Sequence, residues 1–498
     1  MKPLDSKPGQ IPGSNAAPAG KTGYARYLDA VIENGVVFLV LFMPLAFGGV
    51  QQWAISVMET AAFVIFGAWL LKMCAAGKAE FYKTPILYAL AAFIAVAAAQ
   101  MIPMPVWLLA FLSSSSARIF KTFSNDAPGA WRTISIDPQA TMAELWKLLS
   151  YAAVFIVIIN HYRSKEQAVW TLKVIVWLGV FLAVFAVVQK VAWNGRLYWI
   201  YPVREGIESN VFSVWGPYIN HNHFAGYMEL AIPVALGLLL YRATDIRVLP
   251  DLPFKKKLTV WADSKALIPM TALSAAVLVM GGVLFMTLSR GGIIGLASAV
   301  AVFIWMALKR RALKKKAGVL ALVGAALIVV VVLLNWSRME ARFGEIGHEN
   351  RVQRTDVWSD AMGIAKDFPM LGSGLGTFKD AYPMYQTKYS LQYFVHAESD
   401  YVETLTETGI IGFAAAMVMV FHFFYPVVQV WRVRQNTFVK CMAAAGVASI
   451  AALAVHGLTD FNMRIPANAM TATVVAAVTY AIVFNVSDRG KLRVVKSV

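Results

Sequence analysis

Residues 266–288 read ALIPMTALSAAVLVMGGVLFMTL and contain no charged side chain. A helix of that length, at about 1.5 Å per residue, crosses the roughly 30 Å hydrocarbon layer of a bilayer. The whole chain has the same character, because 58% of its 498 residues are hydrophobic and only 15% are charged. A soluble domain could not bury so much apolar surface. The sequence therefore predicts an all-α integral membrane protein.

About twelve apolar runs are long enough to span the membrane. They are residues 31–50, 53–75, 84–103, 140–160, 168–192, 222–241, 266–288, 293–309, 318–335, 409–431, 438–457 and 468–486. Two polar stretches stand between them, at 193–221 and 336–408, and the second is much longer than most helix connections. The predicted organisation is a disordered tail at 1–30, helices one to nine at 31–335, a partly helical catalytic loop at 336–408, helices ten to twelve at 409–486 and a tail at 487–498.

Basic residues predict the orientation of these helices, because Lys and Arg are retained on the cytoplasmic side. With the N-terminus inside, roughly 28 basic residues fall in the cytoplasm and about 14 outside. The clusters at 255–257, 309–316 and 489–496 are then all cytoplasmic, as are both termini. The net charge of +17 is explained by loops that face anionic lipid, so nucleic-acid binding is not needed.

The first thirty residues and the cysteines add two limits. The tail lacks the pattern of a secretory signal, so the first helix is expected to direct insertion. Cys74 and Cys441 both fall near cytoplasmic helix ends, which provides neither a disulfide framework nor a metal site.

The first polar cluster is Asn220-His221-Asn222-His223, within the segment GPYINHNHFAG at 216–226. Four neutral hydrogen-bonding side chains at the outer end of a membrane helix suit a ligand rich in hydroxyl groups, because idle polar groups are costly next to lipid. The alternative is that these residues cap the helix and satisfy one another. A zinc site is conceivable on residue type, but no carboxylate or thiol cluster completes it nearby.

A second candidate is Arg290 in TLSRGG at 287–292, a turn too short to leave the membrane surface. The glycines after it are expected to let the backbone reverse and to leave room beside the guanidinium. That planar group matches phosphate or carboxylate oxygens in paired hydrogen bonds. The alternative is an arginine that extends to lipid headgroups.

The long loop contains an expected amphipathic helix that runs to Lys366, with Arg351 and Arg354 one turn apart. The segment FPMLGSGLG at 368–376 then breaks it, because Pro and three glycines favour turns.

Beyond that break, His396, Asp400, Glu403 and Glu407 fall within roughly 60° of one another on a helix. A carboxylate one turn from a histidine holds one tautomer and raises its basicity, which prepares the imidazole to accept a proton. The alternative is a solvated acidic face. Residues 456–466 add another His, Asp460 and an Arg, which either line or brace the same surface.

Together these segments resemble the O-antigen ligase and Wzy-type polymerase superfamily of bacterial envelope glycan enzymes. The resemblance rests on NHNHFAG at 220–226, LSRGG at 288–292, Arg354 with Pro369 and 372–376, His396 with 400–401 and 407–409, and 460–461 with 466–468. It implies a GT-C-like fold in the bacterial inner membrane. It also implies transfer of a glycan from undecaprenyl diphosphate to an acceptor hydroxyl on the periplasmic face, without a metal or other cofactor.

By the same resemblance, Arg290 would hold the diphosphate, Arg354 would assist it or the donor sugar, and His396 would deprotonate or orient the acceptor hydroxyl. Expected substrate-binding residues are Asn220, His221, Asn222, His223, Arg204, Arg351, Asp400, Glu403, Glu407 and Asp460. One departure concerns an arginine that related sequences often carry shortly before the Gly-Pro at 216–217. This chain has Ser-Val-Trp there, and Arg204 is the candidate substitute.

Ligases and polymerases of this kind differ in the acceptor, which is lipid A core or a protein for one and another lipid-linked repeat unit for the other. The residues do not separate the two, although the overall motif pattern favours a ligase. A transporter or lipid-linked glycan flippase would be equally hydrophobic and would place ionisable groups near mid-membrane. The best candidates for such groups, Lys147 and Lys173, fall near expected helix ends, which favours an enzyme.

Overall fold

The computed structural model describes residues 23–77, 81–123, 130–202, 214–244, 253, 266–309, 352–388, 390 and 393–485. Within them, ten helices are long and apolar enough to cross a membrane. They are α1 (Gly23–Leu45), α2 (Gln52–Ala76), α6 (Pro138–His161), α7 (Lys165–Val191), α8 (His221–Ala243), α10 (Leu267–Met286), α11 (Arg290–Leu308), α15 (Asp400–Val433), α16 (Thr437–His456) and α17 (Pro466–Asn485).

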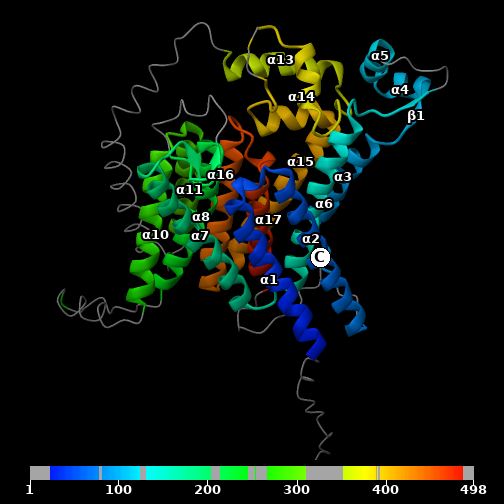
Figure 1. Cartoon of the computed structure of the whole chain (residues 1–498). Helices are drawn as coiled ribbons and strands as arrows, with labels where there is room; N and C mark the ends of the chain where they lie inside the picture. Colours follow the sequence, from blue (N-terminus) through cyan, green and yellow to red (C-terminus); the bar gives the residue numbers. More distant parts are fainter. Residues whose placement is uncertain are drawn as a thin grey trace, which may run out of the picture.

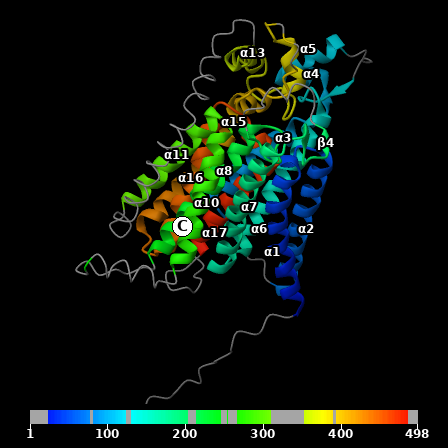
Figure 2. The ribbon, with the colours of Figure 1, turned by 60° about the vertical axis from the view of Figure 1, so that its left-hand side comes forward.

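These helices form a bundle whose two ends differ (Figures 1 and 2). One end carries the short helices α13 (Arg354–Asp367) and α14 (Phe378–Ala381), and α1 begins at the other. We call the end with α13 the loop end. The 3₁₀ turns η1 (Phe47–Gly49), η4 (Tyr382–Met384) and η5 (Asn462–Arg464) complete the helical elements there, together with α4 (Val106–Leu112) and α5 (Ser114–Phe123).

Strands in the described part of the chain are confined to two small ribbons. β1 (Met104–Pro105) pairs antiparallel with β2 (Trp131–Arg132), and β3 (Arg196–Leu197) pairs antiparallel with β4 (Tyr201–Pro202). Each strand has only two residues, so the described part of the chain is almost entirely helical, as expected.

The expected count of twelve spans is not reached in the described residues. The run at 84–103 forms α3 (Pro85–Ala99), whose 15 residues are short for a full crossing. Its last four expected residues leave the helix because the chain turns after Gln100 and reaches Pro103, which cannot continue an α-helix. The ninth expected span, 318–335, lies outside the described residues, as do the basic clusters at 255–257 and 489–496.

Local sequence explains where several helices begin. The side chains of Asp137, Ser164, Asn220, Ser289 and Asn436 each precede a helix and accept a hydrogen bond from a backbone N–H of its first turn. Such caps satisfy donors that have no partner inside the helix.

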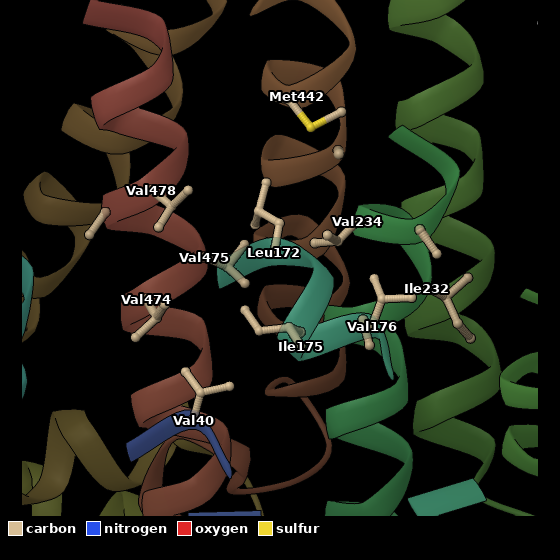
Figure 3. Close-up of a cluster of buried hydrophobic side chains, with 14 of the residues drawn as sticks. Val40, Leu172, Ile175, Val176, Ile232, Val234, Met442, Val474, Val475 and Val478 are labelled. Carbon is tan, nitrogen blue, oxygen red and sulfur yellow. The ribbon is translucent and has the colours of Figure 1, made fainter. Parts of the chain in front are cut away.

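The interior of the bundle is formed by α8, α16 and α17, most of whose residues are buried. Figure 3 shows side chains from α1, α7, α8, α16 and α17 meeting in this core, among them Val40, Ile175 and Val475. Close approach of α16 and α17 depends on Gly446, because a Cβ there would lie 1.9 Å from Thr479 Oγ1. Small residues of this kind drive membrane helix packing, since lipid is as apolar as leucine. By contrast, α15 buries few of its residues and lies at the periphery.

Helix α15 is broken at Gly409, which has a φ of 62°. The helix begins at Asp400, earlier than the expected start of this span at residue 409. Residues 369–374 run beside the break, where Ile410 N–H donates to Pro369 O at 2.8 Å and Gly374 N–H donates to Glu407 O at 3.0 Å. These bonds satisfy the backbone groups that the break releases.

Gln100 clamps this region to α3. Its buried side chain donates to Leu371 O at 2.5 Å and to Glu407 O at 2.7 Å, and it accepts from Leu375 N–H at 2.9 Å. Gly372 allows the segment 369–374 to pass close to α15, because a Cβ there would lie 2.2 Å from the Glu407 carbonyl carbon. The broken helix is thus held in place by segments far away in sequence, which fixes the base of the site described next.

Candidate active site

Three segments meet at Phe461, at the loop end. The His396 ring stacks on the Phe461 ring with centroids 4.2 Å apart and planes at 22°. The His223 ring packs edge-on against the same phenyl ring at 4.7 Å and 71°. One aromatic side chain after α16 therefore brings together the histidines of the 216–226 and 396–409 segments.

His396 is joined to a buried chain of charges. Its Nδ1 lies 2.9 Å from Glu403 Oε1, while the Ala397 N–H donates to Glu403 Oε2, also at 2.9 Å. On the other side, Arg464 Nε lies 3.2 Å from Glu403 Oε1, and its Nη2 donates to Glu407 Oε2 at 2.6 Å. Both carboxylates are almost fully buried, whereas 29% of the His396 side chain is exposed. The imidazole is thus the most exposed member of this chain of charges.

The expected single helical face requires correction. α15 begins at Asp400, so His396 precedes the helix and does not lie on it. Glu398 adopts a φ of 56°, and this turn places His396 over Glu403 rather than over Asp400. Asp400 instead accepts from the Met463 N–H, which lies 3.2 Å from both carboxylate oxygens. The pairing of His396 with a carboxylate is therefore present, but with a different partner.

The electrostatics of His396 follow from this partner. Burial lowers the pKa of His396, but the charge of Glu403 and the hydrogen bond to it outweigh burial and raise the pKa above 6.5. When Nδ1–H donates to Glu403, the lone pair of the neutral ring lies on Nε2. Burial also opposes the charge of Arg464, yet Glu407 and Glu403 raise the pKa of that guanidinium, so it stays positive.

Arg354, the first residue of α13, is held by two carboxylates. Its Nε lies 3.2 Å from Glu398 Oε2 and its Nη2 lies 3.4 Å from Asp460 Oδ2, while Nη1 donates to Thr459 O. Asp460 also lies 3.2 Å from His223 Nε2 and is buried. Burial raises the pKa of Asp460, but the hydrogen bond and charge of His223, with the charges of His456 and Arg354, hold it below its usual value. Asp460 therefore remains a carboxylate that orients Arg354.

Arg290 is the first residue of α11 and its side chain is exposed. Its neighbour Gly291 packs on His456, because a Cβ at Gly291 would lie 2.5 Å from His456 Cδ2. His456 Nε2 in turn lies 3.9 Å from Asp460 Oδ2. Arg290 is therefore at the loop end with Arg354 and His396, and a short series of contacts links the three.

The expected role of the two glycines after Arg290 is also corrected. The chain reverses at Leu288, which has a φ of 57°, and Ser289 caps the helix by accepting from Gly292 N–H at 3.1 Å. Both glycines lie inside α11, where they allow contact with α16 and α8. A Cβ at Gly292 would lie 2.7 Å from Ala225 Cβ.

The four residues of the 220–223 cluster lie in three different settings. Asn220 caps α8, since its side chain accepts from Asn222 N–H at 2.8 Å, as the capping alternative predicts. His223 is buried against Asp460 and Phe461, as described above. His221 and Asn222 are half-buried in the first turn of α8. Arg204 and Arg351, also expected to bind substrate, lie outside the described residues.

A comparison with known families finds one similarity, in the stretch that contains much of this site. Residues 275–417 match the family model Wzy_C, described as O-antigen ligase. This stretch, less than a third of the chain, is similar to O-antigen ligases. No curated protein matches the chain.

The matched stretch contains three of the groups described above: Arg290, Arg354 and the His396–Glu403 pair. The match covers residues 275–417 only, and the ten candidate membrane-spanning helices extend on both sides of it. Asp460, Phe461 and Arg464 follow the matched stretch, so the site combines this stretch with the turn between α16 and α17.

Several residues next to this site were not chosen from the sequence. Glu229 pairs with His456, whose Nδ1 lies 2.8 Å from Glu229 Oε1, and both side chains are buried. A lone acidic residue in an apolar helix is a signal that could have identified Glu229. Phe461 and Arg464 stand in segments singled out from the sequence, but their contacts with His396 and Glu403 join distant segments and were not predicted. Glu398 lacked any such signal.

Proposed function

We propose that the protein is an O-antigen ligase-like glycosyltransferase, which moves a glycan from undecaprenyl diphosphate to an acceptor hydroxyl without a metal. The observation that carries this proposal is the half-exposed His396, paired with Glu403 inside the matched domain and close to an arginine that two carboxylates orient. The bilayer would be the bacterial inner membrane, with both termini in the cytoplasm and the loop end in the periplasm.

Arg290 and Arg354 would bind the donor diphosphate. A guanidinium matches phosphate oxygens in paired hydrogen bonds, and Arg354 is already oriented by Glu398 and Asp460. Arg290 begins α11, and the N-terminus of a helix favours anions. Two cations on separate elements would therefore stabilise the charge that grows on the diphosphate as it leaves.

His396 would act as the proton acceptor. The acceptor hydroxyl oxygen forms a bond with the anomeric carbon of the donor sugar, and the bond from that carbon to the diphosphate oxygen breaks. The hydroxyl proton passes to His396 Nε2, and undecaprenyl diphosphate leaves with the bonding electron pair. Glu403 holds the tautomer that this step needs and stabilises the imidazolium that results.

The other expected site residues would divide between positioning and binding. Asp400, Glu403, Glu407 and Asp460 are held by backbone or side-chain partners, so they would position the reacting groups. Among the polar residues that open α8, His221 and Asn222 are half-buried and would bind sugar hydroxyls.

A transfer assay tests this proposal. Purified protein would be incubated with a synthetic undecaprenyl-diphosphate glycan, either with lipid A core or with the donor in excess. Glycan attached to lipid A core identifies a ligase, whereas lengthened lipid-linked glycan identifies a polymerase. Absence of any transfer product from folded protein, with these acceptors and with a phosphate-free glycolipid acceptor, would refute the proposal.

A further inference from the structure

A cavity of about 340 Å³ lies beside the candidate active site, between α3, α6, α15, α16 and α17. Its walls are almost entirely apolar, and its polar groups gather at the loop end, around Asp400 and Arg464. Phe413, Met417 and Val420 of α15 line it and are only half-buried, so the space remains accessible. None of the roles proposed above uses this cavity.

The depth of the cavity corresponds to one leaflet of a bilayer. On α6, its lining runs from Glu144 to Phe155, which at about 1.5 Å per residue is a distance of roughly 16 Å. Half of a hydrocarbon layer is about 15 Å thick. An acyl chain that stays in one leaflet has this reach, whereas an undecaprenyl chain is much longer.

The rim of the cavity does not favour a diphosphate. Its two cations are Lys147, which contacts Glu144, and Arg464, which lies 3.2 Å from Glu403 and 2.6 Å from Glu407. Each cation is therefore matched by at least one carboxylate. Asp400 adds another acidic group at the rim. Such a rim accepts hydrogen bonds from sugar hydroxyls but does not attract phosphate.

The cavity and Arg290 lie on different sides of α16. Ile450, Ala454 and Gly457 line the cavity, whereas His456, about 100° or more around the helix from each of them, packs against Gly291, next to Arg290. His396 is joined to the rim of the cavity, because Glu403 contacts both its imidazole and the rim residue Arg464. A lipid in the cavity would therefore approach the proton acceptor from the Arg464 rim, on a different flank of α16 from Arg290.

We propose that this cavity holds an acyl chain of the acceptor, which would make the acceptor a membrane-anchored glycolipid with a hydroxyl-bearing head and no phosphate at the rim. This inference rests on the proposed transferase function and names the class of its second substrate.

The first test compares three acceptors that present the same terminal sugar. One is carried on a phosphate-free dialkylglycerol, one is a soluble oligosaccharide and one is carried on undecaprenyl diphosphate. The dialkylglycerol acceptor is expected to have a KM at least tenfold below that of the soluble one, and to be used in preference to the diphosphate-linked one. An equal KM for the anchored and soluble forms, or preference for the diphosphate-linked acceptor, would overturn the inference.

Filling the cavity should remove that advantage. Ala416→Trp adds bulk to the lining, and Val418→Trp is the matched control, since Val418 is exposed on the outer face of the same helix. We expect Ala416→Trp to raise the KM of the dialkylglycerol acceptor to that of the soluble one, with the donor KM unchanged, and Val418→Trp to match wild type. Ala476→Leu, on the α17 wall, provides a milder second variant. A rise in donor KM instead would assign the cavity to the donor chain.

A binding measurement separates failure of this inference from failure of the proposed function. A phosphate-free glycolipid with a photoactivatable acyl chain would be cross-linked to the purified wild-type protein and to Ala416→Trp. Labelled peptides are expected from α3, α6 and α15 in the wild type only, with competition by the unlabelled glycolipid and not by undecaprenyl diphosphate. If no transfer is detected but this labelling is, the transferase proposal fails while the cavity still binds lipid. Absence of labelling there overturns the cavity assignment, whatever the transfer assay shows.

Discussion

Two histidine–glutamate pairs at the loop end have the same contact and different surroundings. His396 Nδ1 lies 2.9 Å from Glu403, and His456 Nδ1 lies 2.8 Å from Glu229. The His396 side chain is 29% exposed, whereas that of His456 is 1% exposed. A proton acceptor must be reached by its ligand. The comparison shows that accessibility, rather than residue type or pairing, distinguishes the candidate catalytic histidine from the interior one.

The interior pair has a packing role that its neighbours make clear. Gly291 of α11 lies against His456, and Gly295 lies against Glu229, where a Cβ would be 2.3 Å from Oε2. The pair therefore stands where α8, α11 and α16 meet. It fixes the start of α11, and with it Arg290, relative to Asp460. We assign to it the positioning of the proposed donor site.

His396→Ala gives the largest expected effect. Loss of a general base typically slows transfer by about 10²- to 10⁴-fold, and the partly exposed side chain contributes little to stability. The measurement is kcat for glycan transfer, together with thermal unfolding in detergent. Activity within twofold of wild type would assign His396 no catalytic role and remove the contrast between the two pairs.

His456→Ala should affect the fold instead. It leaves Glu229 buried without its partner, which costs about 3–5 kcal/mol of stability. The apparent Tm in detergent should fall well below that of His396→Ala. A Tm equal to that of wild type would show that the interior pair does not hold the three helices together. His422→Ala is the control for loss of a histidine elsewhere, because His422 is a half-buried residue of α15 after the break at Gly409.

Arg290→Ala and Arg354→Ala should each reduce kcat/KM by roughly 10- to 150-fold, because hydrogen bonds to charged groups contribute about 1.5–3 kcal/mol. The Lys variants keep the charge but lose the planar fork, so they should recover only part of the activity. Lys366→Ala, at the opposite end of α13 from Arg354, is the control. Full activity in both Ala variants would exclude these arginines from diphosphate binding.

The pH dependence of transfer tests the partner of His396. A proton acceptor must be neutral, so the rate should rise with pH through the His396 pKa, which Glu403 raises above 6.5. Glu403→Gln removes the charge that raises the His396 pKa, whereas burial, which lowers this pKa, remains. The rising limb of the rate against pH should therefore move to lower pH. Glu407→Gln, which contacts Arg464 and not the imidazole, should move it less. If the rate rises over the same pH range in wild type and in Glu403→Gln, the pairing of His396 with Glu403 is contradicted.

The membrane fold was largely predictable, because a long apolar run needs no partner to indicate a span. An apolar run does not indicate where the helix ends inside that run. Gln100 is polar but lies inside the run 84–103, and its clamp on Leu371 and Glu407 is visible only when segments more than 270 residues away are in place. The break of α15 at Gly409 was not predicted either, because the positive φ of this glycine depends on the segment 369–374 that packs against it.

The residues of the site could be found from the sequence more readily than their partners. His396 and a nearby carboxylate were expected together, but the choice of Glu403 over Asp400 depends on the positive φ of Glu398. Phe461 stacks on His396 and Arg464 contacts its partner Glu403, both from beyond α16, at a sequence distance that no local pattern spans. Residue types thus indicated the chemistry, while tertiary contacts determined the geometry.

Asn220→Ala extends the comparison to the smallest expected effect. Because the Asn220 side chain accepts from Asn222 N–H as the cap of α8, its loss should cost about 1 kcal/mol of stability. Asn220→Asp and Asn220→Ser, which also cap helices well, should restore the Tm. If Asn220 is a cap alone, the KM for donor and acceptor stays at the wild-type value in all three variants. If instead the KM rises in Asn220→Ala and Asn220→Ser does not restore it, the Asn220 side chain contacts a sugar. Asn220 would then be a ligand-facing group, like His396, and not an interior group, like His456.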